Sequence, residues 1–356
     1  MPWFNPYLLY WLGISLILNG LVVFLWHKKF YRKFGLKAYQ AIQRIHLNET
    51  PRLGGFIFIL SLLGFVTQSD LGEGAPILHL ILISLAPAML IALKEDLFHN
   101  VEPSVRLLSL LFAAWVFRVN YTGPLPNMAD VPFLGKFLLL QGGGSLFYII
   151  SITAVANGMN LIDGVNGLCG AAALSILAAL LFLSYKTGDT AMLTVTFSLI
   201  LLFIPFMFFN FPFGKIFLGD LGAYSIGLLL SMLTIILFGR HPELSPYAAA
   251  LILIYPVTEI VFTMMRRLLH GTSVFRPDTL HLHLKLYHFL KPQPTYKKTA
   301  NALVMPTLTI LWVFPLLAIA LTYQKTLFLV AAIVIFVLLY LSFYMTIPNV
   351  KKVRKL

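Results

Sequence analysis

Apolar segments of membrane-spanning length recur along this chain and constrain its fold more than any other feature. Each is about 17–22 residues long, close to what an α-helix needs to cross the hydrocarbon core of a bilayer. In such a core, helices satisfy their own backbone polar groups. The sequence predicts an all-α integral membrane protein, a polytopic bundle of about ten to eleven transmembrane helices that forms one domain over residues 1–356. The expected spans are 7–26, 53–69, 77–93, 104–120, 144–160, 168–185, 190–208, 221–238, 247–265, 301–322 and 326–346.

Basic residues are distributed unevenly between the two sides of this predicted bundle. With the N-terminus outside, 21 of the 26 lysines and arginines fall in segments on the inner side and 5 on the outer side. Such a bias is the usual topology signal of membrane proteins, so we expect the C-terminus in the cytoplasm. The net charge of +13 is therefore a sign of membrane topology and of anionic lipids or substrates, and nucleic acid is not an expected partner.

The stretch NGMNLIDGVNGLCG, residues 157–170, places polar side chains at the end of an apolar segment. Asn157, Asn160 and Asp163 are three residues apart and share one face of a helix, and Asn166 joins them if the helix continues. Polar groups at the edge of hydrocarbon are costly, so an aligned row of them indicates a functional site. The alternative is a capped helix end with a polar interfacial turn.

Three carboxylates lie at other predicted cytoplasmic helix ends. Glu95 and Asp96 are adjacent and suit either Mg²⁺-linked phosphates or proton removal from a nucleophile, although neighbouring acids also occur at solvated helix ends. Asp220 lies in GDLG at the start of a span, where it is also a candidate helix N-cap. Mg²⁺ uses one or two protein groups plus substrate phosphates, so Asp220 with an amide oxygen of Asn157 or Asn160 fits that ion.

Two histidines in the longest inner loop, His281 and His283, make a poor zinc site because no third ligand is in evidence. Nearby cations make the loop better suited to a pyrophosphate, where they offset charge on a leaving phosphate. The alternative is a basic loop that touches anionic lipid headgroups. The nearby cations are Arg266, Arg267, Arg276 and Lys285.

The dense polar clusters all lie at predicted cytoplasmic helix ends. A transporter usually places such groups near the bilayer midplane, so this placement favours an enzyme with a cytosolic co-substrate.

Five blocks of sequence, in this order, resemble the polyprenyl-phosphate N-acetylhexosamine-1-phosphate transferases, which belong to glycosyltransferase family 4. This family includes bacterial undecaprenyl-phosphate GlcNAc-1-phosphate transferases. The resemblance covers residues 46–283. The blocks are HLNETPRLGG (46–55), KEDLFHNVEPSVRLL (94–108), NGMNLIDGVNGL (157–168), NFPFGKIFLGDLGAY (210–224) and RRLLHGTSVFRPDTLHLH (266–283).

The resemblance implies transfer of a sugar 1-phosphate from a UDP-sugar to undecaprenyl phosphate, with release of UMP. This is the first membrane step of cell-surface polysaccharide synthesis at the bacterial inner membrane. The sugar is expected to be an N-acetylhexosamine, with N-acetylglucosamine as the default. The alternatives are a phospho-MurNAc-pentapeptide translocase and, from another class, a nucleotide-sugar or lipid-phosphate transporter. The oligomeric state, including a homodimer, stays open.

The resemblance also implies roles for individual residues. Asp220 and Asn160 are the expected Mg²⁺ ligands, with Mn²⁺ as the alternative ion. Asp163 and Asn166 are expected to face the uridine end of the nucleotide, and Asn157 to lie close by. Two departures from the family pattern are Glu95, where the pair is commonly Asp-Asp, and Asn166, where a second Asp is common.

The remaining expectations concern proton transfer and phosphate contacts. Asp96, paired with Glu95, is the candidate for deprotonating or orienting the lipid phosphate. His281, His283 and nearby basic residues are expected to contact the pyrophosphate or sugar. The predicted substrate-binding set consists of Asn157, Asn166, Arg266, Arg267, Lys215, Arg52 and His46; the last two belong to a matched block without an assigned role.

Overall fold

The computed structural model describes residues 5–26, 50–128, 142–271, 280–291 and 297–348, with the single residues 131, 135, 137 and 273. Within these residues it contains helices and no strand, which confirms the predicted all-α class. The helices are α1 (Tyr7–Leu25), α3 (Gly54–Gln68), α4 (Gly74–Phe98), α5 (Pro103–Asn120), α7 (Gly143–Ile162), α8 (Leu168–Thr187), α9 (Thr190–Asn210), α10 (Gly219–Arg240), α11 (Pro246–Ile252), α12 (Ile254–Leu269), α13 (Leu282–Leu290), α14 (Lys297–Thr307), α15 (Thr309–Thr322) and α16 (Thr326–Thr346).

A helix or a broken pair of helices occupies each of the predicted spans. Eight helices in the described part of the chain are long and apolar enough to cross a membrane, or nine if the bent pair α11–α12 counts as one span. The helix α3 is apolar but has only 15 residues, and α5 carries Arg106 and Arg118 near its two ends. The described helices therefore form a multi-pass membrane bundle.

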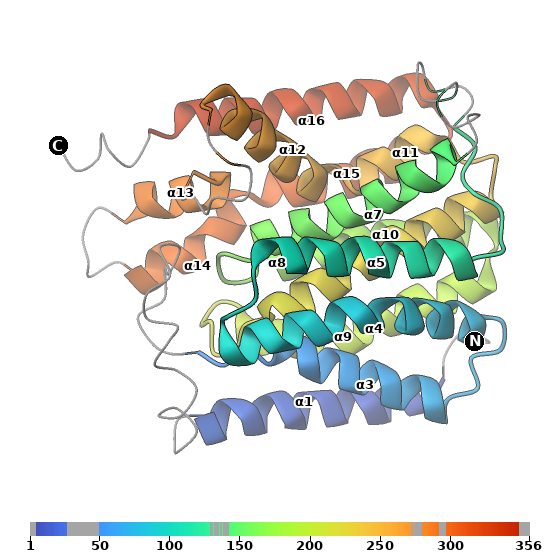
Figure 1. The fold of residues 1–356 in the computed structure, drawn as a ribbon, viewed down its shortest axis with the longest axis horizontal. Coiled ribbons are helices and arrows are strands. Elements are labelled where there is room, and N and C mark those ends of the chain that lie inside the picture. The colour runs from blue at the N-terminus through green and yellow to red at the C-terminus, as the bar shows by residue number, and fades with distance from the viewer. Residues whose placement is uncertain are drawn as a thin grey trace.

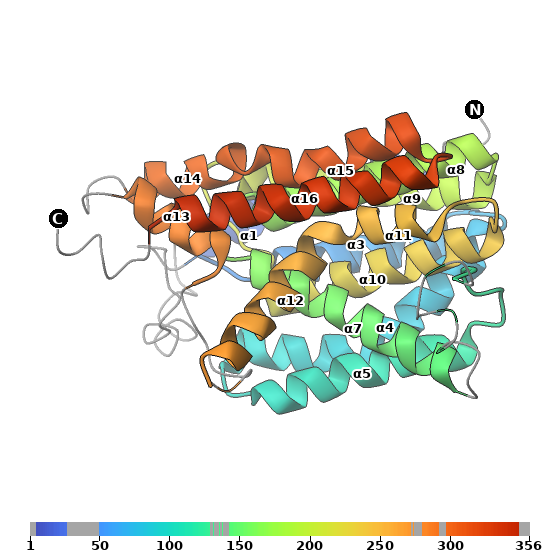
Figure 2. The same cartoon turned by 90° about the horizontal axis from the view of Figure 1, so that it is seen from above.

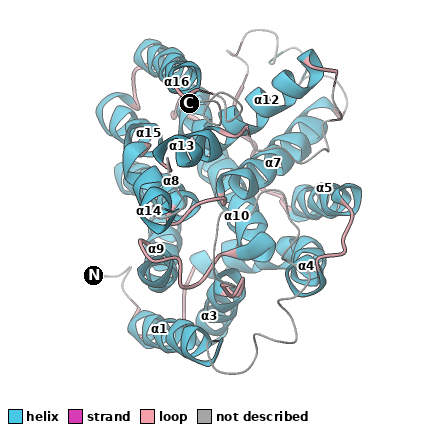
Figure 3. Ribbon diagram, turned by 90° about the vertical axis from the view of Figure 1, so that its left-hand side faces the viewer, coloured by secondary structure: helices cyan, strands magenta, loops and turns pink. Residues whose placement is uncertain are grey.

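The helices lie side by side along the long axis of the molecule, and α1 begins at the end opposite to the one where α16 finishes (Figure 1). Seen along the helices, α10 occupies the middle of the bundle, with α3, α4, α7, α8 and α9 around it (Figure 3). Every residue from Gly219 to Gly239 is buried. The helix α10 is therefore the core of the bundle.

Small residues allow the neighbouring helices to approach α10 closely. A Cβ added to Gly55 of α3 would lie 2.2 Å from the Cα of Gly222, and one added to Gly227 would lie 2.6 Å from the Cα of Ala156 in α7. Lipid provides no hydrophobic driving force between helices, so their association depends on such close backbone packing. These contacts fix α3 and α7 against α10.

The ninth predicted span is broken. The helices α11 and α12 meet at an angle of 74°, and α12 runs obliquely away from α11 (Figure 2). Pro256 in the first turn of α12 has no N–H to donate, so it cannot continue the hydrogen bonding of α11. The buried side of α12 includes Glu259 and Thr263, whereas Met265 and Leu268 are exposed. This inverted polarity fits a helix that faces lipid and directs its polar groups inward.

Hydrogen bonds between loops tie together one end of the bundle. The Gly54 N–H donates to Phe217 O (2.9 Å) and joins the start of α3 to the segment before α10. The Gly167 N–H donates to the Asn210 side chain (2.7 Å) and joins the start of α8 to the end of α9. The described parts of all five sequence blocks meet at this end, where α13 also lies (Figure 1).

The close approach of α7 and α10 can be tested with a single methyl group. The substitution Gly227→Ala should lower the free energy of unfolding by about 1–3 kcal/mol, because the added carbon overlaps Ala156. Thermal unfolding in detergent would measure the effect. Gly13→Ala is the matched control, since nothing lies within 4 Å of a Cβ there. Equal melting temperatures for the two variants would contradict the described packing.

Candidate active site

The first turn of α10 forms the centre of a polar cluster. Gly219 adopts a φ of 77°, and a Cβ there would lie 2.6 Å from Asp96 Oδ2. Both the backbone conformation and the close neighbour therefore require glycine. The next residue, Asp220, has a side chain only 8% exposed, and it meets side chains from three other segments of the chain.

Two guanidinium groups bind the carboxylate of Asp220. Arg52 Nη2 donates to Oδ1 (2.6 Å), and Arg106 Nη1 donates to Oδ2 (2.8 Å). Arg52 Nε also lies 3.2 Å from Asp96 Oδ1. Burial disfavours the charged guanidinium of Arg52, but Asp220, Asp96 and Asp163 outweigh this effect and raise its pKa. Arg52 therefore carries a fixed positive charge among three carboxyl groups.

Asp96, at the end of α4, caps the N-terminus of α10. Its Oδ1 accepts the Asp220 N–H (2.9 Å) and its Oδ2 accepts the Leu221 N–H (2.8 Å). Its side chain is only 2% exposed. The first N–H groups of a helix have no partner within the helix, so a carboxylate supplied by another helix satisfies them. Asp220 was a candidate N-cap from the sequence, but this cap comes from Asp96.

The neighbouring Glu95 binds elsewhere. Its Oε2 accepts the Val101 N–H (2.9 Å), and its Oε1 lies 3.9 Å from Arg106 Nη1. It therefore stabilises the turn between α4 and α5. The two adjacent acids thus have separate local partners.

The polar row on α7 is present over its first three members. Asn160 Nδ2 lies 3.4 Å from Asp220 Oδ1, and Asp163 is the C-cap of the helix. Burial raises the pKa of Asp163 well above its ordinary value; Arg52 opposes this shift, and Asp220 and Asp96 reinforce it. Asn157 donates to the Thr153 carbonyl one turn earlier (3.0 Å). Asn160 and Asp163 thus belong to the same cluster as Asp220.

Asn166 lies beyond this row because α7 ends at Ile162. Its N–H donates to the Asn301 side chain (2.7 Å), and its Nδ2 donates to Pro212 O (2.9 Å). Asn166 is buried and connects the α7–α8 turn with the α9–α10 loop and α14. These bonds do not test the predicted contact between Asn166 and uridine, which stays a prediction.

His281 and His283 lie at the start of α13 with nearly parallel rings, 5.8 Å between centroids. Both are buried, and burial lowers the pKa of His283 to about 3. His283 Nε2 packs on Gly164, where a Cβ would lie 2.4 Å from it. Gly164 follows Asp163 directly, so this contact brings the histidines next to the carboxylate cluster.

Glu259 of α12 is fully buried and lies next to His281. Its Oε1 is 3.2 Å from His281 Nδ1, and its Oε2 accepts the Tyr340 hydroxyl (2.9 Å). The Thr263 hydroxyl also lies 3.3 Å from His281 Nδ1.

The other predicted basic residues surround this end of the bundle. Arg266 and Arg267 are half-buried in the last turn of α12, and Lys215 is exposed between α9 and α10. Lys285 donates to Tyr344 O (2.7 Å) and so anchors α13 on α16. His46 and residue 276 lie outside the described residues.

Two residues of this cluster were absent from the predicted site. Arg106 lies inside the second sequence block, and a cation next to paired acids was a signal that could have identified it. Glu259 lies within an apolar span, where a single ionisable residue is itself a functional signal.

The oxygen donors of the cluster are of the kind that suits a hard divalent ion. No group of three His, Cys, Asp or Glu side chains among the described residues is arranged to hold a metal. Mg²⁺, however, needs only one or two protein oxygens beside substrate phosphates. Asp220 with Asn160 provides such a set, and Asp220 also binds two arginines there.

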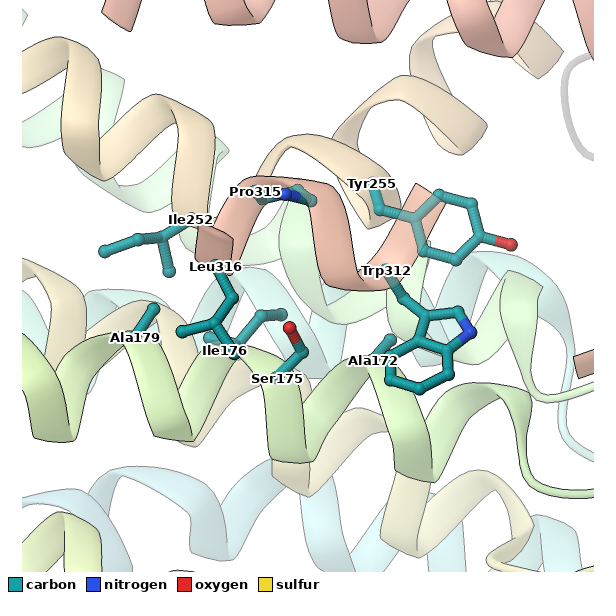
Figure 4. Close-up of a pocket in the computed structure, with 9 residues that line it drawn as sticks. All are labelled: Ala172, Ser175, Ile176, Ala179, Ile252, Tyr255, Trp312, Pro315 and Leu316. Atoms are coloured by element: carbon teal, nitrogen blue, oxygen red, sulfur yellow. The ribbon is translucent and has the colours of Figure 1, made fainter. Parts of the chain in front are cut away.

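A small cavity elsewhere in the bundle is not an alternative substrate site. It lies between α8, α11, α12 and α15, measures about 10 Å³, and is mainly apolar apart from Ser175 and Tyr255 (Figure 4). Its volume is near that needed for one water molecule, and far too small for a nucleotide sugar.

The chain is similar to known proteins over the region that contains most of this site. The family model described as glycosyl transferase family 4 matches residues 78–238, which hold Asp96, Asn160, Asp163 and Asp220. This match supports the resemblance to the family that the sequence blocks indicate. Of the described residues that bond to the Asp220 side chain, Arg106 and Asn160 lie within the matched region and Arg52 lies before it.

Several bacterial proteins are similar to the chain over most of its length. An Escherichia coli (strain K12) undecaprenyl-phosphate alpha-N-acetylglucosaminyl 1-phosphate transferase is 26% identical, over 76% of this chain and 74% of its own. A Mycobacterium tuberculosis (strain CDC 1551 / Oshkosh) decaprenyl-phosphate N-acetylglucosaminephosphotransferase is also 26% identical, over 71% and 69%. A Bacillus subtilis (strain 168) protein, named "Probable undecaprenyl-phosphate N-acetylglucosaminyl 1-phosphate transferase", is 23% identical, over 74% and 72%.

The capping role of Asp96 can be tested by changing one atom of its side chain. Asp96→Asn should lower the free energy of unfolding by about 1–3 kcal/mol, because an amide nitrogen would face a backbone N–H of α10. Thermal unfolding of the purified protein measures the loss. Glu95→Gln is the comparison, since it can keep an oxygen on Val101 N. An unchanged melting temperature for Asp96→Asn would exclude the cap.

The buried His283 should make stability depend on pH. Because its folded pKa of about 3 lies below the ordinary 6.5, the unfolded chain takes up a proton first as pH falls. The free energy of unfolding is highest above about pH 7 and decreases by about 2 kcal/mol between pH 7 and pH 5. Melting temperatures at both pH values, compared with His283→Asn, should show a smaller decrease in the variant. Parallel decreases would contradict a neutral, buried His283.

Proposed function

We propose that this chain transfers a sugar 1-phosphate from a UDP-sugar to undecaprenyl phosphate and releases UMP. The names of the similar proteins specify an N-acetylglucosaminyl group, so UDP-N-acetylglucosamine is the proposed donor. In this reaction an oxygen of the lipid phosphate attacks the β-phosphorus of the donor. The bond from that phosphorus to the bridging oxygen breaks, and the oxygen leaves with UMP.

The observation that carries the proposal is the convergence of the polar residues on the start of α10. Arg52, Arg106, Asn160 and Asp220 come from four segments and meet within hydrogen-bond distance. The buried His281–His283 pair lies next to them through Gly164. Phosphoryl transfer depends on positioning and on stabilising charge, and this site offers rigidly held polar groups for both.

The arginines are the proposed contacts for the departing phosphate. The Arg52 side chain is 35% exposed and that of Arg106 is 24% exposed, so both are partly accessible to a ligand. A guanidinium presents paired donors that match phosphate oxygens. We expect a bound pyrophosphate to take over part of the bonding that these arginines now give to Asp220.

Asp96 is proposed to position the site, without acting as a proton acceptor. Its two oxygens hold the first N–H groups of α10 and Arg52. The second pKa of a phosphate monoester is near 6, so at neutral pH the lipid phosphate is largely a dianion. Attack by a dianion needs no base. The sequence predicts that Asp96 either deprotonates or orients the lipid phosphate, and its capping geometry supports the second role.

Mg²⁺ is the proposed cofactor, with Asp220 and Asn160 as its protein ligands. When bound, it would polarise the phosphoryl oxygens and offset charge that develops on the leaving phosphate. Asp163 lies close enough to interact with Arg52, Asp220 and Asp96. We therefore expect Asp163 to contribute to the charge of the ion site.

The proposed location is the cytoplasmic face of a bacterial inner membrane. The segments predicted to lie on the inner side carry most of the basic residues of the sequence, and the described site residues Arg52, Arg106 and Lys215 belong to them, which fits the positive-inside rule. A water-soluble nucleotide sugar would then reach the site from the cytosol, and the lipid phosphate from the membrane.

The reaction can be tested with purified protein in detergent, undecaprenyl phosphate, Mg²⁺ and a panel of UDP-sugars that includes UDP-MurNAc-pentapeptide. We expect UMP only when UDP-N-acetylglucosamine and lipid are both present, and none after chelation. Asp220→Asn should reduce turnover at least about a hundred-fold, because it removes a charged group on which the site converges. Asp70→Asn is the matched control, an exposed acid whose bond to Gly72 N an asparagine can keep.

Each alternative outcome is distinct. Release of UDP would mean glycosyl transfer and would overturn the proposed bond cleavage. UMP from UDP-MurNAc-pentapeptide alone would identify the translocase activity instead. Full activity of Asp220→Asn would remove the metal assignment, and absence of any nucleotide product would favour a transporter.

A further inference from the structure

We propose that Glu259 is a positioning residue that sets the orientation and tautomer of His281 in the transfer site. The inference rests on the proposed function and on the sequence-based expectation that His281 contacts the pyrophosphate or sugar. It starts from a carboxylate in an unusual place. Glu259 lies on the buried side of α12 with Tyr255 and Thr263, and its exposed fraction is 0%.

The cost of burying this carboxylate indicates that it has a specific task. An ionisable side chain inside a membrane segment is expensive, and where one occurs it pairs with a defined partner. Here Oε1 faces His281 Nδ1 (3.2 Å) and the Leu282 N–H (3.3 Å), and Oε2 accepts the Tyr340 hydroxyl (2.9 Å). Both oxygens therefore have donors, as an ionised carboxylate requires.

The bond at Nδ1 of His281 determines whether Nε2, on the opposite side of the ring, accepts or donates a hydrogen bond. A carboxylate on Nδ1 holds a proton there, so the neutral ring keeps Nε2 as an acceptor. The protonated ring would be stabilised by the same carboxylate and would donate from Nε2. In either form, the contact with Glu259 keeps Nδ1 of His281 toward α12 and Nε2 away from it. This is the arrangement in which a carboxylate orients a histidine that acts on something else.

The oriented ring is connected to the carboxylate cluster through His283. The two rings are nearly parallel, with an angle of 10° between their planes. His283 Nε2 packs on Gly164, next to Asp163. His283 Nδ1 is buried and has no hydrogen-bond partner among the described residues. Glu259 thus fixes the first of two stacked rings whose second ring touches the α7–α8 turn.

A purely structural role for Glu259 makes a different prediction. Its bonds also join α12 to Leu282 of α13 and to Tyr340 of α16, so its loss could loosen the packing of these helices. Loosened packing would reduce activity whether or not an imidazole is present at position 281. A positioning role acts only through that imidazole, and this difference allows a double-mutant cycle to separate the two.

The experiment measures UMP release by wild type, Glu259→Gln, His281→Ala and the double variant, all in detergent with saturating lipid. Glu259→Gln keeps the shape of the side chain but removes its charge. We expect kcat to fall about 10–100-fold in the wild-type background, the range found for residues that orient metal-binding histidines. In the His281→Ala background the same change should alter kcat by less than about two-fold.

Tyr340→Phe is the matched control, because it removes a partner of Glu259 and leaves the bond to His281 in place. It should keep kcat within about three-fold of wild type. If Glu259→Gln does not fold, Glu259→Asp carries the same test. It retains the charge but is one methylene shorter, so it withdraws the carboxylate from His281.

Three results would overturn the inference: equal losses from Glu259→Gln in both backgrounds, no loss in wild type, or full activity of His281→Ala. Failure of the proposed function would look different. Wild-type protein would then release no UMP, or Asp220→Asn would be as active as wild type.

Discussion

The N-terminus of α10 is the point on which the rest of this structure depends. The first residues of this helix are buried, so its first N–H groups need partners from the protein. Asp96 of α4 accepts two of these N–H groups, and its charge also suits the positive end of the helix. Arg52 then bridges Asp96 and Asp220, which fixes the start of α3 to the same turn. One buried helix end thus determines where three helices meet.

The need to give every buried polar group a partner also explains why polar groups in this bundle form long-range pairs. In lipid, a polar side chain gains little from facing outward, so α12 exposes Met265 and Leu268 and turns Glu259 inward. The partners of Glu259 are distant in sequence, 22 positions away for His281 and 81 for Tyr340. Such pairs specify which helices are neighbours, whereas apolar contacts alone would permit several arrangements.

The sequence was informative where local pattern decides structure. The spans followed from hydropathy, because a membrane core requires long apolar helices, and each predicted span contains a helix. Asn160 and Asp163 followed from helical spacing. Asn166 depended on the helix continuing, and α7 ends at Ile162. The partnership of Arg106 with Asp220 spans 114 positions, and no local pattern encodes a contact of that length. His46 lies outside the described residues, so its place in the site stays a prediction.

The charges at the site are the reason for including a cation in the proposed reaction. Asp96, Asp163 and Asp220 face Arg52 and Arg106, so with all groups ionised the cluster carries more negative than positive charge. The proposed substrates are a pyrophosphate and a phosphate, which add negative charge to a site that already has an excess. Burial raises the pKa of Asp163, and a proton there is one way to reduce the excess. A divalent ion is another, and it would favour the ionised form of the same carboxyl group. Proton and metal binding should therefore compete, and the affinity for the ion should increase as pH rises through the pKa of Asp163.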